Sequence, residues 1–278
     1  MAGHTISLYL KEKGYDVTGF ARSDLKLVKT IIGDARNLVN LEETIRNGDY
    51  RYVVNCIGIL NKNAEKNKSE AILLNSYLPH LLEDITRKMK TQIIHISTDC
   101  VFSGKRGQYT ENDLRDGETF YDRSKALGEI ENNKDFTIRT SIIGPDMNPQ
   151  GIGLLNWFLQ QDESVQGYTR AIWTGITTLQ LAKIVEQVAK EDAHGLYNLV
   201  PEKGVSKYEL LILCKKYLRS DDIRIEKSAT PLIDKSLKRT RFDYEFYIPE
   251  YETMIMELGK WMQEHRRLYT QYTNTWLY

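Results

Sequence analysis

Apolar positions follow two periods along the first half of the chain. Ala2, Ile6 and Tyr9 recur at helical spacing, and Gly14 stands where such a helix would end. Short runs rich in β-branched residues then predict strands at 16–20, 29–33, 52–58, 92–97 and 136–143. Amphipathic segments between these runs predict helices at 40–47, 69–89 and 122–133. This pattern begins with a helix, whereas an α/β chain usually begins its sheet with a strand.

The alternation predicts an α/β fold built on a doubly wound parallel sheet, with helices on both faces. After about residue 145 the rhythm becomes less regular, with a loop, a helix at 152–161 and a strand at 196–200. We therefore divide the chain into residues 1–145 and a smaller α/β part, 146–278, with some segments returning to the first sheet. Ligands of such sheets bind at the carboxyl ends of the strands.

Composition narrows the classes of partner. Lysine plus arginine equals aspartate plus glutamate, 38 each over 278 residues, so charge gives no reason to expect nucleic acid or an anionic membrane. No apolar run approaches the roughly 20 residues that span a bilayer, and no signal peptide is evident. The three cysteines and five scattered histidines show no metal-ligand spacing. We expect no metal, and a reducing, cytoplasmic location.

Two stretches carry candidate chemistry. Ser-Thr-Asp-Cys-Val-Phe-Ser-Gly at 97–104 follows the apolar run 92–96, which places hydroxyls at the end of a central strand. Tyr-Asp-Arg-Ser-Lys at 121–125 opens a helical segment, and its four-residue spacing puts Tyr121 and Lys125 on one helix face. An ammonium beside the phenol would lower its pKa from about 10 and suit it to proton transfer. Thr98 would then orient a substrate oxygen.

Tyr-x-x-x-Lys alone is a weak signal, because a chain with 17 tyrosines produces such pairs by chance. The combination with Ser-Thr-Asp at a strand end is much stronger. The chain resembles the extended short-chain dehydrogenases/reductases, and within them the dTDP-4-dehydrorhamnose reductase group of nucleotide-sugar enzymes. STDCVFSG and YDRSK followed by ALGE match its hallmarks, as do Arg139-Thr140-Ser141 and the segments NCIG and LLNSYLPHLL.

The resemblance implies an NAD(P)-binding Rossmann domain at 1–145 and a substrate-binding part at 146–278. Members begin with a strand and the turn GxxGxxG, and Met-Ala-Gly at 1–3 looks like the end of that motif, with Gly3 as its third glycine. The first strand and two glycines are then missing, and we favour a start codon assigned too late over a true truncation. The missing turn would supply most amides for the cofactor pyrophosphate.

Cofactor choice follows from the end of the strand at 16–20. An acidic residue there would favour NAD, whereas Arg22 and Ser23 suit the 2′-phosphate of NADPH, with NADH as the alternative. The resemblance adds further cofactor-binding residues, which are Gly3, Asp34, Ala35, Asn55, Cys56, Ile57, Gly58, Asn75, Tyr121 and Lys125.

Substrate contacts are where the match becomes thinner. The family's tryptophan after RTS is Ile142 here, and its tyrosine after STD is Cys100. These departures place dTDP-4-dehydrorhamnose itself in doubt. We assign Asp99, Cys100, Asn156, Trp157, Arg170 and Trp173 to the substrate side, with Arg170 as a partner of a diphosphate and the tryptophans as packing surfaces.

We expect a reductase of a nucleotide-activated 4-keto-6-deoxy sugar, in deoxysugar and surface polysaccharide biosynthesis. Thr98, Tyr121 and Lys125 are the predicted catalytic residues. Two alternatives stay open. One is an epimerase of the same superfamily, and the other is a non-catalytic NAD(P)-binding subunit, for which a lost glycine-rich turn would be natural. The oligomeric state, including a homodimer, and the role of the aromatic tail at 265–278 also stay open.

Overall fold

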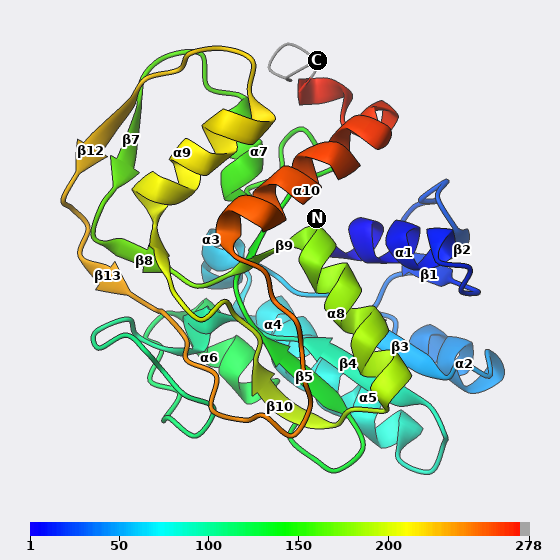
Figure 1. Ribbon diagram of the computed structural model, residues 1–278. Coiled ribbons are helices and arrows are strands. Elements are labelled where there is room, and N and C mark those ends of the chain that lie inside the picture. The colour runs from blue at the N-terminus through cyan, green and yellow to red at the C-terminus, as the bar shows by residue number, and fades with distance from the viewer. Residues whose placement is uncertain (273–278) are drawn as a thin grey trace.

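The computed structural model describes residues 1–272, and Figure 1 shows the arrangement of their helices and strands. The main sheet is parallel and has the order β10-β5-β4-β3. Its strands are β3 (Tyr52–Asn55), β4 (Gln92–Ile96), β5 (Phe136–Arg139) and β10 (Gly195–Asn198). A second parallel sheet joins β1 (Thr18–Ala21) to β2 (Lys29–Ile32). The fold is therefore mixed α/β with parallel sheets, as the hydrophobic pattern predicts, and it is Rossmann-like, as the resemblance implies.

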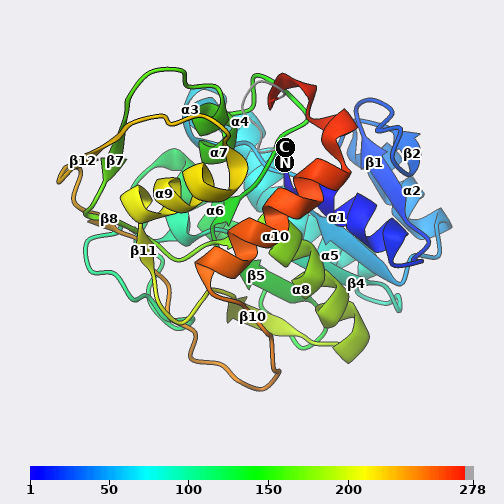
Figure 2. The ribbon, with the colours of Figure 1, turned by 45° about the horizontal axis from the view of Figure 1, so that its top comes forward.

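Helices cover the strands on both faces. In the first half they are α1 (Ala2–Glu12), α2 (Leu38–Asn47), α3 (Asn61–Lys66), α4 (Lys68–Ala71), the π-helix η1 (Ile72–Tyr77), α5 (Leu78–Thr86) and α6 (Phe120–Leu127). Helix α1 packs against α8 (Thr178–Glu191), as Figures 1 and 2 both show. Helices α2 and α5 contact one another around a separate apolar cluster that includes Leu41, Ile45 and Leu82.

The strands differ in how completely they are paired and buried. Strands β4 and β5 have neighbours on both sides and are almost fully buried. Strand β3 has a paired neighbour only in β4, and Tyr52, Val53 and Val54 are only partly buried. Strand β1 likewise pairs only with β2 among the described residues. Both strands thus have an open edge, although their apolar sequences are typical of a sheet interior.

The second half builds a smaller layer beside the sheet. It contains α7 (Leu154–Leu159), α9 (Lys207–Leu218) and α10 (Tyr251–Glu264), with short strands β6 (Ile142–Ile143), β7 (Val165–Tyr168), β8 (Ala171–Trp173), β9 (Ile176–Thr177), β11 (Val205–Ser206), β12 (Ile225–Ser228) and β13 (Ile233–Asp234). Helix α10 packs against both α8 and α9 (Figure 2). Strand β10 returns to the main sheet and pairs with β5 in parallel.

The predicted helix at 122–133 is wrong in length, because α6 ends at Leu127. Gly128 follows, and a Cβ there would meet the backbone oxygen of Asn75 at 1.9 Å. The predicted strand at 136–143 is divided into β5 and β6, which pair with different strands. The predicted helix at 69–89 contains the π-helical segment η1. Residues 273–278 of the aromatic tail lie outside the described residues.

Both ends of the described chain meet at Asp146. The Met1 ammonium lies 3.6 Å from Asp146 Oδ1, and the Tyr272 hydroxyl accepts from the Asp146 backbone N–H at 3.1 Å. Tyr269 and Tyr272 are buried, and His4 bonds to the Tyr269 hydroxyl. Across residues 1–272, no helix is both long and apolar enough to cross a membrane.

Candidate active site

A buried ion-pair network holds the end of β4. Glu129 accepts from Nε and Nη2 of the Arg139 guanidinium, at 2.8 and 2.7 Å, and from the Ser97 hydroxyl at 2.6 Å. Arg115 is a further partner. Burial would raise the pKa of Glu129, but hydrogen bonds from Arg139 and Ser97 outweigh it and keep the carboxyl ionised. Arg139 of the RTS motif and Glu129 of the ALGE motif therefore have a structural role: together with Ser97 they hold the end of the strand that carries Thr98.

Helix α6 begins at a capping box immediately before Tyr121. The Thr119 hydroxyl accepts from the Asp122 N–H at 3.1 Å, and the Asp122 carboxylate accepts from the Thr119 N–H at 3.3 Å. Lys235 pairs with the same carboxylate at 3.4 Å. The amino end of the helix is thus held both by its own capping residues and by Lys235 from far along the chain. Tyr121, the second residue of the helix, is buried beside Cys100 and Ala64.

The strand-end and helix motifs converge as the sequence predicts. The Thr98 hydroxyl lies close enough to Tyr121 to favour its phenolate, while Asp99 and Cys100 lie nearby. Thr98 also donates to Asp99 Oδ1 at 3.1 Å and accepts from the Cys100 N–H at 3.2 Å. Burial raises the pKa of the Asp99 carboxyl, and it raises that of the Cys100 thiol to about 12. A thiol with a raised pKa stays protonated at neutral pH, which disfavours Cys100 as a nucleophile.

The expected lowering of the Tyr121 pKa is not what the structure shows. Burial raises the Tyr121 pKa, Cys100 and Asp99 add to the rise, and only Thr98 opposes it. Lys125 is not among the main influences on the Tyr121 pKa, and its ammonium has other partners. It donates to the Ile96 carbonyl oxygen at 2.8 Å and lies 3.5 Å from His95 Nε2. Burial lowers the pKa of Lys125 to about 8. Tyr121 is thus held as a neutral phenol.

Asn75 joins the loop after β3 to helix α6. Its Oδ1 accepts from the Ile59 N–H at 2.8 Å, and its Nδ2 donates to the Ile59 carbonyl and to Ser124 Oγ. Asn75 lies in the π-helix, a local distortion that is common at functional sites. Gly58 passes so close that a Cβ would lie 3.1 Å from Asn75 Oδ1. We therefore assign Asn75 a positioning function for the loop that contains Ile57 and Gly58.

The predicted adenosine-side residues come together at the ends of β1 and β2. Arg22 and Ser23 are exposed after β1, and Arg22 lies near enough to Asp34 to lower the pKa of that carboxyl. The main cause of the lowering, to about 2, is Arg36, which donates to Asp34 through its side chain and backbone. Ala35 is buried in the neighbouring apolar cluster. Sequence reasoning missed Arg36, whose second partner is Glu70.

The amino end of α1 lies beside the end of β3. A Cβ on Gly3 would be 3.7 Å from the Cys56 Cβ, so the two backbones approach closely. Met1 provides no side-chain cap, which leaves the first amides of this 11-residue helix for an anion. Cys56 is exposed at the end of β3, and partial desolvation of its thiol raises the pKa to about 11. These features fit the diphosphate of a dinucleotide.

Among the described residues, four predicted substrate residues make no hydrogen bond or ion pair with Thr98, Asp99, Cys100 or Tyr121. Asn156 is buried and donates to the Pro149 and Gly151 carbonyls, so it holds a loop. The Trp173 ring donates to Ser141 Oγ at 2.9 Å and packs near Tyr251. Trp157 and Arg170 are exposed. Two lysines that sequence reasoning missed, Lys207 and Lys235, act electrostatically on Asp99 instead.

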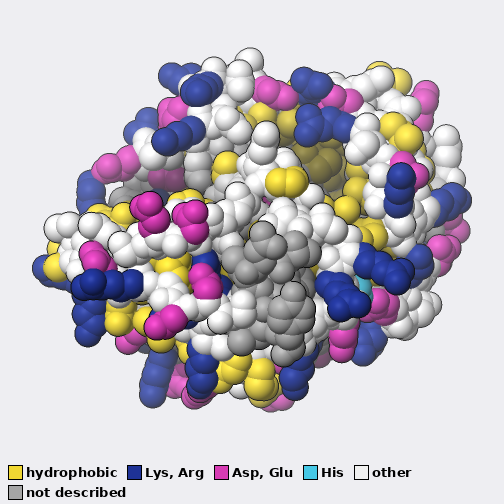
Figure 3. All heavy atoms as spheres, turned by 90° about the horizontal axis from the view of Figure 1, so that it is seen from above, with side chains coloured by type: hydrophobic (Ala, Val, Ile, Leu, Met, Phe, Trp, Pro, Cys, Tyr) yellow, Lys and Arg dark blue, Asp and Glu magenta, His cyan; other side chains and the backbone are white. Residues whose placement is uncertain are grey.

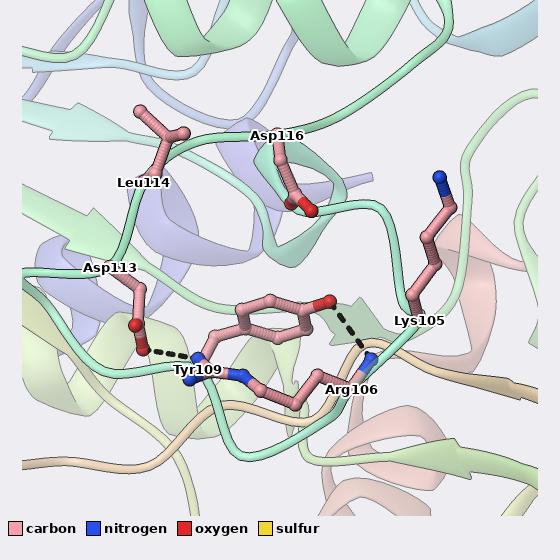
Figure 4. Close-up of a pocket in the computed structure, with 6 residues that line it drawn as sticks. All are labelled: Lys105, Arg106, Tyr109, Asp113, Leu114 and Asp116. Carbon is pink, nitrogen blue, oxygen red and sulfur yellow. Dashed lines mark hydrogen bonds and ion pairs between the residues drawn. The ribbon is translucent and has the colours of Figure 1, made fainter.

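Two hollows on the described part of the surface differ in character. A hollow with largely hydrophobic walls opens on the face seen in Figure 3. A second, of about 210 Å³, is lined by Lys105, Arg106, Tyr109, Asp113, Leu114 and Asp116 (Figure 4). Its charges satisfy one another, since Arg106 pairs with Asp113 at 2.6 Å and Lys105 with Glu118 at 2.5 Å. It contains none of the predicted site residues, and we assign it no ligand.

Comparison with known proteins shows to which family the chain belongs. The model of the RmlD substrate binding domain family matches residues 1–242. The chain belongs to this family. Among curated proteins, the spore coat polysaccharide biosynthesis protein SpsK of Bacillus subtilis (strain 168) is 32% identical over 124 residues. That match covers 43% of this chain and 40% of SpsK, so it spans less than half of either protein.

Solved structures of other proteins share this fold at low sequence identity. A hypothetical dTDP-4-dehydrorhamnose reductase from Sulfolobus tokodaii has a TM-score of 0.76 at 20% identity, covering 90% of this chain and 94% of that one. The dTDP-4-dehydrorhamnose reductase of Bacillus anthracis, in complex with NADP, gives 0.72 at 15% identity, covering 87% and 97%. WbmG of Bordetella bronchiseptica, with NAD and UDP, gives 0.73 at 12%, covering 95% and 92%.

Proposed function

We propose that the protein is an NAD(P)H-dependent reductase of a nucleotide-activated 4-keto-6-deoxy sugar. The observation that carries the proposal is the meeting of Thr98 and Tyr121 at the end of β4, with Lys125 one helical turn further on. Membership of the RmlD family supports the substrate class, and the resemblance to SpsK supports a role in polysaccharide synthesis. The solved relatives bind NADP or NAD, which supports the cofactor class.

Each residue has a distinct role in this proposal. A bound nicotinamide cofactor would supply the hydride. Tyr121 is a buried, neutral phenol, which is the protonation state that a donor to the sugar oxygen needs. Thr98 orients that oxygen with its hydroxyl. Lys125, with a pKa of about 8, is largely protonated at neutral pH and provides a positive charge beside the cofactor. Asn75 keeps the loop after β3 in register with this helix.

We further propose NADPH as the preferred reductant. The exposed Arg22 guanidinium and the Ser23 hydroxyl follow β1 and provide donors for a 2′-phosphate. Replacement of Arg22 by glutamate should weaken NADPH binding at least tenfold and spare NADH. Fluorescence titration with each cofactor measures the dissociation constants of NADPH and NADH. Equal losses for the two cofactors would contradict the assignment, because a damaged site would not discriminate between them.

The direct test is turnover on nucleotide-linked 4-keto-6-deoxy sugars. We would incubate the full chain with NADPH and each of the dTDP-, UDP- and GDP-linked forms, and follow NADPH absorbance. Tyr121→Phe should lower kcat at least 100-fold while NADPH binding is retained. Unimpaired turnover in this variant would exclude Tyr121 as the proton donor. Sugar conversion without net NADPH consumption would indicate an epimerase instead.

A non-catalytic, cofactor-binding subunit is the second candidate. The observation that favours it is the direction of Lys125, whose ammonium donates to the Ile96 carbonyl and not toward Tyr121. This role predicts NADPH binding with no turnover on any nucleotide sugar, and a stoichiometric partner enzyme in a pull-down. The reductase proposal predicts that NADPH binding draws Lys125 toward the cofactor ribose and that turnover follows.

A further inference from the structure

A buried polar chain runs from the end of β3 through β4 to the catalytic helix. Asn55 Nδ2 lies 3.1 Å from His95 Nδ1, and His95 Nε2 lies 3.5 Å from Lys125 Nζ. All three side chains are at least nine-tenths buried. None of the predicted catalytic roles uses His95, although it occupies the strand position that faces Lys125. A buried imidazole in this place requires an explanation beyond packing.

The orientation of Asn55 determines which histidine nitrogen carries the proton. Asn55 Oδ1 accepts from the Ile57 backbone N–H at 3.1 Å, so the other end of the amide, its NH₂ group, faces His95. An amide NH₂ can only donate, and His95 Nδ1 must therefore accept. Burial and the nearby Lys125 ammonium hold the pKa of His95 well below its usual value, so the ring is neutral. Its single proton then resides on Nε2.

We propose that Asn55 and His95 form a positioning pair for Lys125, in which Asn55 fixes the proton of His95 on Nε2 and that N–H faces the lysine amine. When Lys125 is charged, two donors oppose each other. The separation of 3.5 Å is longer than an ordinary hydrogen bond, and the ammonium turns to the Ile96 carbonyl at 2.8 Å. When Lys125 is neutral, its lone pair accepts from His95. The pair thus sets the direction and the protonation of the lysine, and this inference rests on the proposed function only for its catalytic consequence.

Two titratable groups around Lys125 oppose the effect of burial on its pKa. Glu129, after α6, and Cys56, after β3, raise the pKa of Lys125, but burial outweighs both. His80 acts on His95 from α5. Asn55 carries no charge, so it acts on Lys125 only by fixing the tautomer of His95. The consequence is a lysine that loses its proton close to physiological pH and gains a hydrogen bond when it does.

The tautomer can be observed directly, without substrate or turnover. In protein labelled with ¹⁵N-histidine, the two ring nitrogens of His95 should have the shifts of a neutral ring protonated at Nε2. Their shifts should change near pH 8, as Lys125 loses its proton. His80→Gln, which removes a partly exposed histidine, provides the assignment control and should leave both features in place. A His95 ring protonated at Nδ1 would overturn the proposal.

Asn55→Asp reverses the pair. A carboxylate must accept from Nδ1–H, which leaves Nε2 as an acceptor for the Lys125 ammonium. We expect the His95 tautomer to change and the titration near pH 8 to move upward by about one unit, a tenfold change in proton affinity. The double variant Asn55→Asp, His95→Phe retains the added charge without the imidazole. In this double variant, the pH dependence of NADPH binding should not show the upward shift. A shift of equal size would assign the effect to the added charge and would overturn the proposed positioning pair.

This design separates the two proposals. If the protein reduces no nucleotide sugar, the NMR spectra and the pH dependence of NADPH binding still decide the tautomer. If it does reduce one, the alkaline side of the pH profile of kcat/KM should shift in the same variants. A merely structural role for His95 would change stability and leave that pH profile in place.

Discussion

At the scale of single residues, Lys125 has the clearest consequence for stability. Its pKa is about 8 in the folded protein, whereas an unfolded lysine titrates near 10.4. Between these values the unfolded chain binds more protons, so stability rises with pH in that window. Below pH 8 both states hold the proton and the buried ammonium destabilises the fold. We therefore predict that Lys125→Met raises the Tm at pH 7 by several degrees, and that the gain declines toward pH 10.

Thermal unfolding at pH 7, 8.5 and 10 measures this difference. Lys11→Met is a matched control, because Lys11 is exposed and its ammonium donates to the Leu27 carbonyl at the surface. A Tm difference for Lys125→Met that is independent of pH would mean that the ammonium is not desolvated in the fold.

At the scale of elements, the end of α6 depends on one close approach. A Cβ on Gly128 would lie 1.9 Å from the Asn75 backbone oxygen, and neither backbone can move without disturbing the Asn75–Ser124 bond. Gly128→Ala should cost about 3 kcal/mol of the free energy of unfolding. Gly3→Ala is the matched control, since its Cβ would be 3.7 Å from Cys56 and it lies in a helix. That change should stabilise by about 0.5–1 kcal/mol. Urea denaturation compares the two, and similar costs would contradict the contact.

The elements also show how far sequence reasoning reaches. The run QIIHI and the hydroxyls after it are local signals, and they predict β4 and the position of Thr98 correctly. The end of α6 and the direction of Lys125 depend on Asn75 and on Asn55 with His95, which come from other elements. Asn156 and Trp173 were assigned to substrate from residue type alone, but their polar atoms bond within the protein. Lys235 was missed because only β13 brings it to Asp122.

At the scale of the whole molecule, the open edge of β3 makes a testable distinction between adjacent valines. The Arg51 carbonyl accepts from Gln92 on β4, so alternation directs the Val53 backbone toward β4 and that of Val54 toward the open edge. Val53→Pro should therefore cost about 3 kcal/mol or more, because it removes a ladder bond. Val54→Pro should cost about 1 kcal/mol or less, as proline is tolerated on a free edge. Chemical denaturation of the two variants gives the comparison, and equal costs would mean that both edges of β3 are paired.

The division of the sheet has a dynamic consequence. No strand pairing among the described residues links β1 and β2 to the four-stranded sheet, so the unit from β1 to α2 is attached through α1, side-chain packing and the loops. Cooperative opening should follow that division. Amide hydrogens of β1 and β2 should exchange with solvent deuterium as one group, at a lower free energy than those of β4 and β5. This unit also carries Arg22 and Asp34, so a dinucleotide that contacts both parts should slow the exchange of β1 and β2 far more than that of β4.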